Sequence, residues 1–297
     1  MRLAGKVVFL TGTSPNIGGG LAEVLAEEGA AIACVDFKPD YADACADAVR
    51  KTGGRACAIA CDITDATQVE CAVRETVETF GKVDVLINNA VIFNRKGVLD
   101  MPVEEWRRQI DVILTGAFLA TKYCAARMVE PGAGGSIINV ISTAGHQGEP
   151  GNIAYSTAKA GLLNFTRSAA MELASRGVRV NSLTPTATEP SDAAARAARW
   201  GLSVTRSPGA EGRYANFRRG VPMQRLPEPR HYGKAAAFLA SDDAEMITGE
   251  DLRVDGGAVA RYWAWDPSAT GRVERRAGGP RGRGAAEVAR QDERQNL

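Results

Sequence analysis

Three side chains in the middle of the sequence could carry out proton transfer together. Tyr155 and Lys159 are four residues apart in an apolar pattern that predicts a helix over 153–173, so both would lie on one face. A neighbouring ammonium group favours the phenolate, and we expect it to lower the pKa of Tyr155. Ser142 ends an apolar run typical of a buried strand, and its hydroxyl could hold a substrate oxygen. Alone, a Tyr and a Lys at this spacing are more often a surface pair.

The composition is that of an ordinary globular protein. The chain has 297 residues, of which 45% are hydrophobic and 24% charged, which predicts one large α/β domain with additions. Its formal net charge of +1 gives no field that would attract nucleic acid or a membrane surface. The N-terminal residues do not resemble a signal peptide, and no apolar run approaches membrane-spanning length. We therefore expect neither nucleic acid nor a membrane as a partner.

The cysteines indicate the compartment. All six lie outside CxxC pairs, and most lie inside apolar segments, which is typical of reduced, buried thiols. We therefore expect a cytoplasmic protein, and we predict no metal site.

A glycine-rich turn follows the first predicted strand. The run KVVFLT at 6–11 is followed by GTSPNIGGG and then by a helical apolar pattern that starts at Leu21. In this order, the turn lets backbone approach a pyrophosphate at the positive end of the helix. An ordinary strand–helix turn is the alternative interpretation.

An acidic residue ends the second predicted strand. The apolar run 31–36 ends in Asp36, about twenty residues after the glycine turn, where a dinucleotide-binding fold places a carboxylate on the ribose hydroxyls. Asp36 favours NAD, because it would repel the 2′-phosphate of NADP. Lys38 could soften that repulsion.

Strands and helices then alternate along the chain. We predict helices at 41–51, 66–80, 101–128, 153–173 and 233–241, and strands at 56–61, 83–88, 135–141, 178–183 and 251–254. Such alternation requires right-handed parallel crossovers, so the fold class is α/β, with a doubly wound parallel sheet covered on both faces. We expect the last strand at an edge of this Rossmann-type sheet.

Two segments depart from this alternation. Residues 185–229 are rich in Pro, Gly and Arg, with only 193–200 helix-like, which predicts a substrate lid at about 186–229. After Arg261 the periodicity ends, so we interpret 1–261 as the folded domain and 262–297 as a tail that is disordered from about 268. The lid arginines could bind an anionic substrate but are more often solvated charges: Arg196, Arg199, Arg206, Arg213, Arg218 and Arg219.

Several motifs together resemble those of the short-chain dehydrogenase/reductase family, from about Leu3 to Ala260. The matching segments are TGTSPNIG at 11–18, Asp62-Ile63, NNAV at 88–91, Ser142 with YSTAK at 155–159, RVNSLTP at 179–185 and TGEDLRVDGG at 248–257. The resemblance implies a Rossmann-type subunit, commonly a homotetramer, that moves hydride between a nicotinamide and a carbonyl or alcohol.

The resemblance also implies residue roles. Tyr155 would be the acid/base, Lys159 would bind the nicotinamide ribose and lower the pKa of Tyr155, and Ser142 would polarise the substrate oxygen. The implied cofactor site, from pyrophosphate to ribose, adenine, strand-end backbone and carboxamide, comprises Gly12, Ser14, Asn16, Ile17 and Gly18, then Asp36, Asp62 and Ile63, Asn89 and Thr188.

Four positions depart from the family pattern. Asn16 replaces the middle glycine of the first motif; it tolerates a left-handed conformation better than most residues but brings a side chain near the phosphates. Val91 replaces the glycine of NNAG and is expected to reshape the floor of the site. Thr186 stands where the family has Pro-Gly. Ile113 occupies the place of the family's relay asparagine and cannot hydrogen-bond, so we expect proton delivery to limit the rate.

These observations favour an NAD(H)-dependent oxidoreductase that interconverts a secondary alcohol and a ketone. One alternative is a nucleotide-binding regulatory protein without turnover, for which Ile113 is the hint. Another is a 3-oxoacyl reductase, which Asp36 disfavours because such reductases usually employ NADPH.

Assembly as a homotetramer or homodimer is implied by the family's pairing of two long helices between subunits. The faces expected to pack against a partner carry small or apolar residues, namely Ala117, Ala120 and Thr121, and Leu163, Ala170 and Leu173.

Overall fold

The computed structural model describes residues 1–130, 134–203 and 209–266. The chain divides into two units, Met1–Arg261 and Tyr262–Leu297. In the second unit, the amide of Trp265 donates to the carbonyl of Tyr262 at 2.9 Å. The predicted disordered segment at 268–297 lies outside the described residues.

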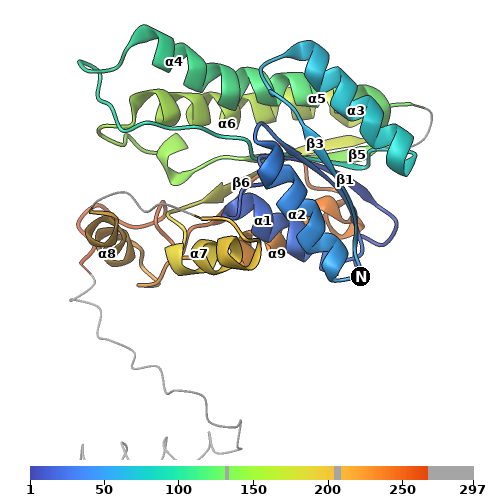
Figure 1. The fold of residues 1–297 in the computed structure, drawn as a ribbon. Helices are drawn as coiled ribbons and strands as arrows, with labels where there is room; N and C mark the ends of the chain where they lie inside the picture. The colour runs from blue at the N-terminus through green and yellow to red at the C-terminus, as the bar shows by residue number, and fades with distance from the viewer. Residues whose placement is uncertain (131–133, 204–208, 267–297) are drawn as a thin grey trace, which may run out of the picture. The chain divides into compact units, whose positions relative to one another are not determined.

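Seven strands form one parallel sheet in the order β3-β2-β1-β4-β5-β6-β7, which confirms the predicted fold class (Figure 1). Their bounds are β1 Val7–Thr11, β2 Ala31–Asp36, β3 Arg55–Ala60, β4 Val85–Asn88, β5 Gly135–Val140, β6 Val178–Pro185 and β7 Asp251–Val254. The chain winds outward from β1 to β3, then returns to β4 and winds the other way. The winding therefore reverses between β1 and β4, and β7 is an edge strand as expected.

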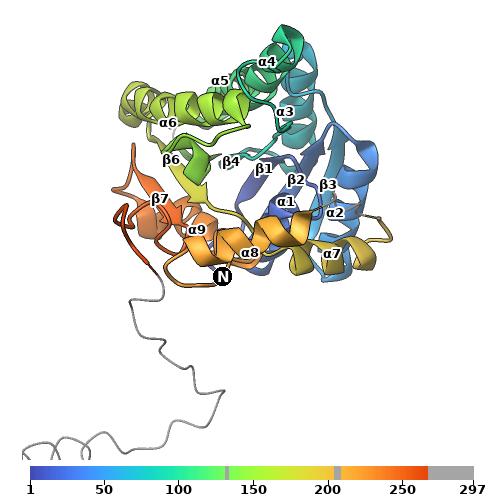
Figure 2. The same cartoon turned by 90° about the vertical axis from the view of Figure 1, so that its left-hand side faces the viewer.

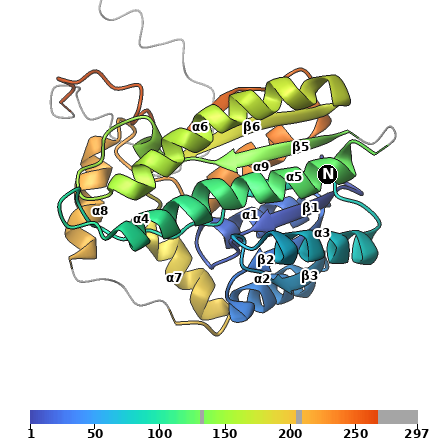
Figure 3. The same ribbon diagram turned by 90° about the horizontal axis from the view of Figure 1, so that it is seen from above.

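Helices cover both faces of the sheet (Figures 1 and 2). One face carries α1 Ile17–Glu27, α2 Pro39–Lys51 and α9 Pro229–Ala240. The other carries α3 Ala66–Phe80, α4 Val103–Ile110, α5 Gly116–Met128 and α6 Ile153–Leu173. Seen from above, α5 runs between α6 and α3 (Figure 3).

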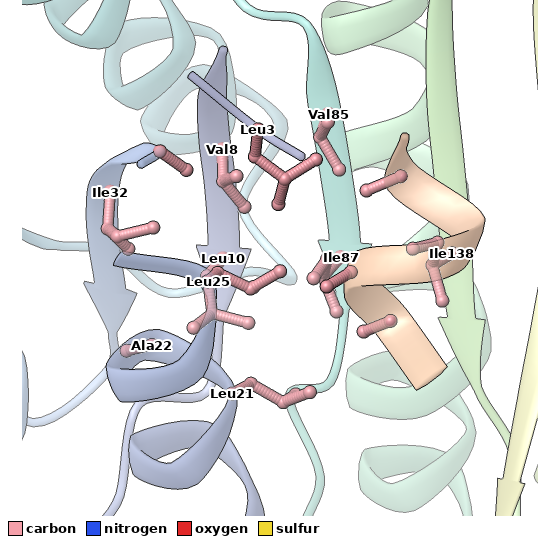
Figure 4. Packing of buried hydrophobic residues seen from close by; sticks show 14 of the residues in the cluster. Leu3, Val8, Leu10, Leu21, Ala22, Leu25, Ile32, Val85, Ile87 and Ile138 are labelled. Atoms are coloured by element: carbon pink, nitrogen blue, oxygen red, sulfur yellow. The ribbon is translucent and has the colours of Figure 1, made fainter. Parts of the chain in front are cut away.

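The central strands are buried on both faces. Along β1, Leu10 packs into the cluster under α1 and α9 with Leu25 and Ile138 (Figure 4), whereas Phe9 points into the cluster on the opposite face. Side chains alternate across a strand, so a strand covered on both sides must be apolar throughout. Burying each such side chain stabilises the fold by about 1.5–3 kcal/mol.

The single helix predicted at 101–128 is wrong in one respect. Its middle, Asp111–Thr115, forms a π-helical turn between α4 and α5, in which the amide of Gly116 donates to the carbonyl of Asp111. A π turn inserts one residue without breaking the helical course, so the apolar spacing on either side still reads as one helix. The inserted turn contains Ile113.

The lid range contains two helices, α7 Pro190–Arg199 and α8 Ala210–Gly220. The sequence pattern anticipated only the first, because α8 has no fully buried residue and so lacks an apolar stripe. Tertiary contacts hold α8 in its place: Arg218 pairs with Glu189 at 3.1 Å. The interpretation of 185–229 as otherwise irregular is therefore corrected.

One buried arginine fixes α7 against the glycine turn. The Arg196 side chain belongs to a residue that is 3% exposed, and its Nε donates to Glu23 of α1 at 3.0 Å. Its Nη1 donates to the carbonyl of Pro15 at 3.2 Å and to Asp192 at 2.7 Å. This charge therefore has a structural role, and the lid helix packs directly on the loop between β1 and α1.

The faces expected to meet a partner subunit are largely inside the chain. Ala117, Ala120, Thr121 and Ala170 are all buried, because these small residues let α5 and α6 approach the sheet and each other. The expectation that they form an exposed face is wrong. The exposed side of the same helices instead forms a groove lined by Leu114, Thr115, Phe118, Gly161, Asn164 and Phe165.

Candidate active site

The carboxyl ends of the strands gather most of the candidate residues at one edge of the sheet. Ser14 and Asn16 follow β1, Ser142 follows β5, and Thr188 follows β6. Together with Tyr155 of α6 they line one cavity of about 710 Å³. Residues of α7 and α8 line the same cavity, as expected of a lid.

The glycine turn closes tightly against β4. Gly12 has φ +75°, and a Cβ there would lie 2.7 Å from the Cα of Ala90. A Cβ at Gly18 would lie 1.9 Å from the carbonyl oxygen of Gly12. Asn89 donates from Nδ2 to that same oxygen at 2.6 Å. Side chains are excluded from both glycine positions, and Asn89 joins the two strand ends.

Asn16 adopts an unexpected conformation. Its φ is −95°, so the left-handed conformation anticipated at this position is not used. The side chain makes no cap hydrogen bond, while the carbonyl accepts from the amide of Gly20 at 3.2 Å. Asn16 lines the cavity, and Ile17 begins α1 directly after it.

Asp36 is held in position by backbone amides. Its Oδ2 accepts from the amide of Thr13 at 2.7 Å, and its Oδ1 accepts from the amide of Lys38 at 3.0 Å. Burial raises the pKa of Asp36, and these two hydrogen bonds lower it by less. The hydroxyl of Thr13 is buried without a hydrogen-bond partner beside this carboxylate's anchor.

Asp62 and Ile63 follow β3. The Asp62 carboxylate accepts from the Thr64 hydroxyl at 2.7 Å and pairs with Arg108 of α4 at 3.2 Å. Burial raises the pKa of Asp62, but the hydrogen bonds from Thr64 and Arg108 outweigh it and leave this pKa below its usual range. Ile63 is buried. The pair therefore presents one anchored carboxylate and one apolar side chain.

Ser142, Tyr155 and Lys159 converge as the spacing predicted. Ser142 has an extended backbone, and its Oγ accepts from the amide of Ala144 at 3.1 Å. The Ser142 side chain also hydrogen-bonds the phenol of Tyr155. One turn along α6, the Nζ of Lys159 lies 5.9 Å from the centre of the Tyr155 ring.

The electrostatics of this group differ from the expectation. Burial raises the pKa of Tyr155, and the hydrogen bond from Ser142 offsets only part of that rise. Lys159 is 2% exposed, and burial lowers its pKa to about 7. The predicted lowering of the Tyr155 pKa by Lys159 is therefore not met, because an amine desolvated to this degree is only partly charged at neutral pH.

The polar partner of Lys159 is a strand carbonyl. Its Nζ donates to the carbonyl of Val140, at the end of β5, at 2.5 Å. Ile113 instead packs in an apolar cluster with Ala117, Ile141 and Leu162. The side chain that stands where the family has a relay asparagine therefore contributes packing and no hydrogen bond.

Sequence reasoning missed the neighbours of Tyr155 in the loop after β4. Phe93 meets the Tyr155 ring edge-on, with ring centres 5.8 Å apart. Arg95 pairs with Glu149 at 3.4 Å, and Glu149 accepts from Nδ2 of Asn152 at 3.0 Å. A loop without periodicity gives no signal that it folds back over α6.

The loop after β6 rests on a buried tyrosine. The Tyr232 hydroxyl donates to the carbonyl of Thr186 at 3.3 Å and lies 3.2 Å from Oγ1 of Thr188. Tyr232 is fully buried in the core under α9. This anchor fixes the Pro185-Thr186 segment without the glycine found in the family pattern.

Comparisons with known proteins agree with this architecture. A family model described as enoyl-(acyl carrier protein) reductase matches residues 12–259. The uncharacterized oxidoreductase YxbG of Bacillus subtilis (strain 168) is 36% identical over 263 residues, which cover 88% of this chain and 94% of the relative. A trans-4-hydroxycyclohexanecarboxylate dehydrogenase of Sinomonas cyclohexanicum is 37% identical over 265 residues, which cover 87% and 95%.

The crystal structure of a short-chain type dehydrogenase/reductase from Mycobacterium marinum superposes with a TM-score of 0.77 at 31% identity, covering 88% of this chain and 97% of that chain. The chain belongs to the short-chain dehydrogenase/reductase family. It is therefore an oxidoreductase of a family that binds a nicotinamide cofactor and acts on small molecules.

The residues around the glycine turn fit the cofactor of the short-chain dehydrogenase/reductase family. Gly12 and Gly18 leave backbone exposed where a Cβ would collide, and the turn ends at the positive end of α1. The carboxylate of Asp36 and the unpartnered hydroxyl of Thr13 lie beside it. Pyrophosphate and ribose groups are therefore matched by the donors and acceptors present.

Two further findings bear on the class of protein. Over 1–130, 134–203 and 209–266, no helix is long and apolar enough to cross a membrane. In the same residues, no group of three or more His, Cys, Asp or Glu side chains could hold a metal ion. All six cysteines are free thiols.

The buried amine of Lys159 makes stability depend on pH. Its pKa is about 7 in the folded chain, against about 10.4 when unfolded, so between these values the unfolded chain binds more protons. The free energy of unfolding should therefore rise with pH across this window, by up to about 1.4 kcal/mol per pH unit. Urea unfolding from pH 6.5 to 9.5 measures the slope.

Two variants isolate the contribution of Lys159 to that slope. Lys159→Met should remove this part of the pH dependence, whereas Lys122→Met, which removes an exposed amine from α5, should leave it intact. Equal pH slopes for wild type and Lys159→Met would show that the buried amine does not titrate in this range.

Proposed function

We propose that the protein is an NAD(H)-dependent oxidoreductase that interconverts a secondary alcohol and a ketone. The observation that carries the proposal is that Ser142 and Tyr155 line the same cavity as Ser14 and Asn16 of the glycine turn. This arrangement puts a hydroxyl pair beside the loop that fits a dinucleotide. It supports turnover over a purely regulatory role, for which binding residues alone would suffice.

In the proposed reaction, the chain's own residues handle the substrate oxygen and its proton. A bound nicotinamide accepts or donates the hydride at its C4 carbon. The Ser142 hydroxyl orients the substrate oxygen, and Tyr155 exchanges a proton with it. Because burial raises the pKa of Tyr155, the phenol is protonated at neutral pH and suited to donate its proton to the oxygen of a ketone under reduction.

Lys159 is the nearest amine to this phenol along α6. With its pKa at about 7, it can exist in both protonation states at neutral pH, so we propose that it replenishes the proton lost by Tyr155. Its hydrogen bond to the Val140 carbonyl would hold the amine in place as it changes charge.

Substitution of the phenol tests the proposed acid–base role. Tyr155→Phe deletes only the proton-transfer group, so kcat should fall by about 10²–10⁴-fold while the Kd for NADH stays within about twofold. The assay follows absorbance of the reduced cofactor with NAD⁺ and a panel of secondary alcohols. Tyr214→Phe, which removes another cavity hydroxyl, is the matched control and should stay active. Near-normal rates in Tyr155→Phe would contradict this mechanism.

Cofactor choice should follow from Asp36. Its carboxylate is fixed by the amides of Thr13 and Lys38, so it cannot easily move away from a 2′-phosphate. We expect NADH to bind at least about tenfold more tightly than NADPH, a difference of about 1.4 kcal/mol. Fluorescence titration of both cofactors measures this preference.

The same titrations on two variants assign the preference to this carboxylate. Asp36→Asn should reduce the discrimination, and Asp40→Asn, an exposed acid at the start of α2, should not. A wild type that binds NADPH equally well would remove the argument for NAD.

We also propose that subunits pair through the groove on α5 and α6. Phe118 is 49% exposed there and lies beside Leu114 and Phe165 in a hollow of about 380 Å³. An exposed aromatic group in an apolar hollow fits a protein interface. We expect a homotetramer or homodimer in sedimentation, shifted to smaller species by Phe118→Glu and unchanged by Leu99→Glu, whose residue is 94% exposed. A wild-type monomer at micromolar concentration would exclude this assembly.

A further inference from the structure

The arginines of the lid separate into two groups. Three of those described have partners that explain them: Arg196 and Arg199 pair with Glu23, and Arg218 pairs with Glu189. These charges hold α7 and α8 in place. For them, the interpretation as ordinary structural and surface charge is sufficient.

Arg213 and Arg261 differ because both line the cavity that contains Ser142 and Tyr155. Arg213 lies in the first turns of α8, and Arg261 lies near the other end of that helix, where its Nη1 donates to the carbonyl of Gly220 at 3.1 Å. Figures 1 and 3 place α8 at the same end of the molecule as the start of α6, which carries Tyr155.

The charge of the cavity wall is unbalanced. Among the described lining residues, the arginines are Arg95, Arg213 and Arg261, whereas Glu149 is the one carboxylate. Glu149 already pairs with Arg95 at 3.4 Å on the side near Tyr155. The excess positive charge therefore lies on the lid side, with Arg213 and Arg261.

The remaining wall is largely apolar. Phe93 borders the Tyr155 ring, and Tyr214 and Phe217 lie together on α8 with ring centres 6.4 Å apart. Aromatic faces suit the hydrocarbon part of a ligand, while a guanidinium suits a carboxylate, which it can bind through two parallel hydrogen bonds. Such charge-assisted bonds are stronger in a partly enclosed cavity than in water.

We infer that the substrate of the proposed reaction is a hydroxy acid or keto acid, with its secondary alcohol or ketone at Ser142 and Tyr155, its hydrocarbon body against Phe93, Tyr214 and Phe217, and its carboxylate at Arg213 and Arg261. This inference rests on the proposed function and adds the substrate class. The lid thereby recognises a charge that the hydroxyl pair does not contact.

Matched acids and esters test the inference. The probes are 3-hydroxybutyrate, 5-hydroxyhexanoate and 7-hydroxyoctanoate with their methyl esters, assayed with NAD⁺. The series varies the distance between alcohol and carboxylate and keeps the reacting group constant. At the best chain length, we expect kcat/KM for the acid to exceed that for its ester by about 10- to 100-fold, the worth of one to two charge-assisted hydrogen bonds.

Variants assign that preference to the two arginines. Arg213→Met and Arg261→Met should each lower kcat/KM for the acid by about tenfold or more, chiefly through KM, and change the ester by less than about threefold. The Kd for NADH should stay constant. Arg219→Met, which removes a charge from α8 away from the cavity lining, is the control and should leave the acid preference intact.

Several outcomes would overturn the inference, and they separate it from the proposed function. Equal use of acids and esters by the wild type would contradict the acid preference and leave the oxidoreductase activity standing. Loss of NADH affinity in Arg213→Met would assign this charge to the cofactor. No turnover of either class by a wild type that binds NADH would refute both. Where Arg213→Met fails to fold, the wild-type comparison of acids and esters decides.

Discussion

The close approach of β1 and β4 at their carboxyl ends is the contact on which the site depends. Gly12 presses its Cα against the Ala90 backbone, and Asn89 ties the two ends together through the Gly12 carbonyl. The contact exists because the winding of the sheet reverses here, so that no helix crosses between these strands and their two following loops diverge. Everything that touches the dinucleotide position, including the anchored Asp36, is arranged around this junction.

Desolvation is the second constraint, and it acts on the residues proposed for proton transfer. Lys159 lies between α6 and the end of β5, where it finds a carbonyl but no carboxylate. Its charged form is therefore disfavoured, and so is the phenolate of Tyr155. The apolar cluster around Ile113 contributes to this dry environment. Burial thus sets the protonation of both groups, where the sequence motif alone suggested that one charge would control the other.

The lid adds selectivity to a scaffold that is otherwise generic for its family. Through Arg196, α7 is bonded to the loop that follows β1, so the substrate side and the dinucleotide side of the cavity share one wall. Helix α8 brings aromatic and basic side chains to the same space. Specificity can therefore change with the lid while the strand ends stay constant.

The sequence by itself determined the fold class, the strand order implied by the family motifs, and the convergence of Ser142 with Tyr155, because each rests on local periodicity and on the common edge of a parallel sheet. Only the tertiary structure decided the π turn at Ile113, the helix α8, the burial of Ala117 and Ala170, and the carbonyl partner of Lys159. The physical reason is that these features depend on contacts between segments distant in the chain, where packing and desolvation outweigh local propensity and leave no periodic signal in the residues themselves.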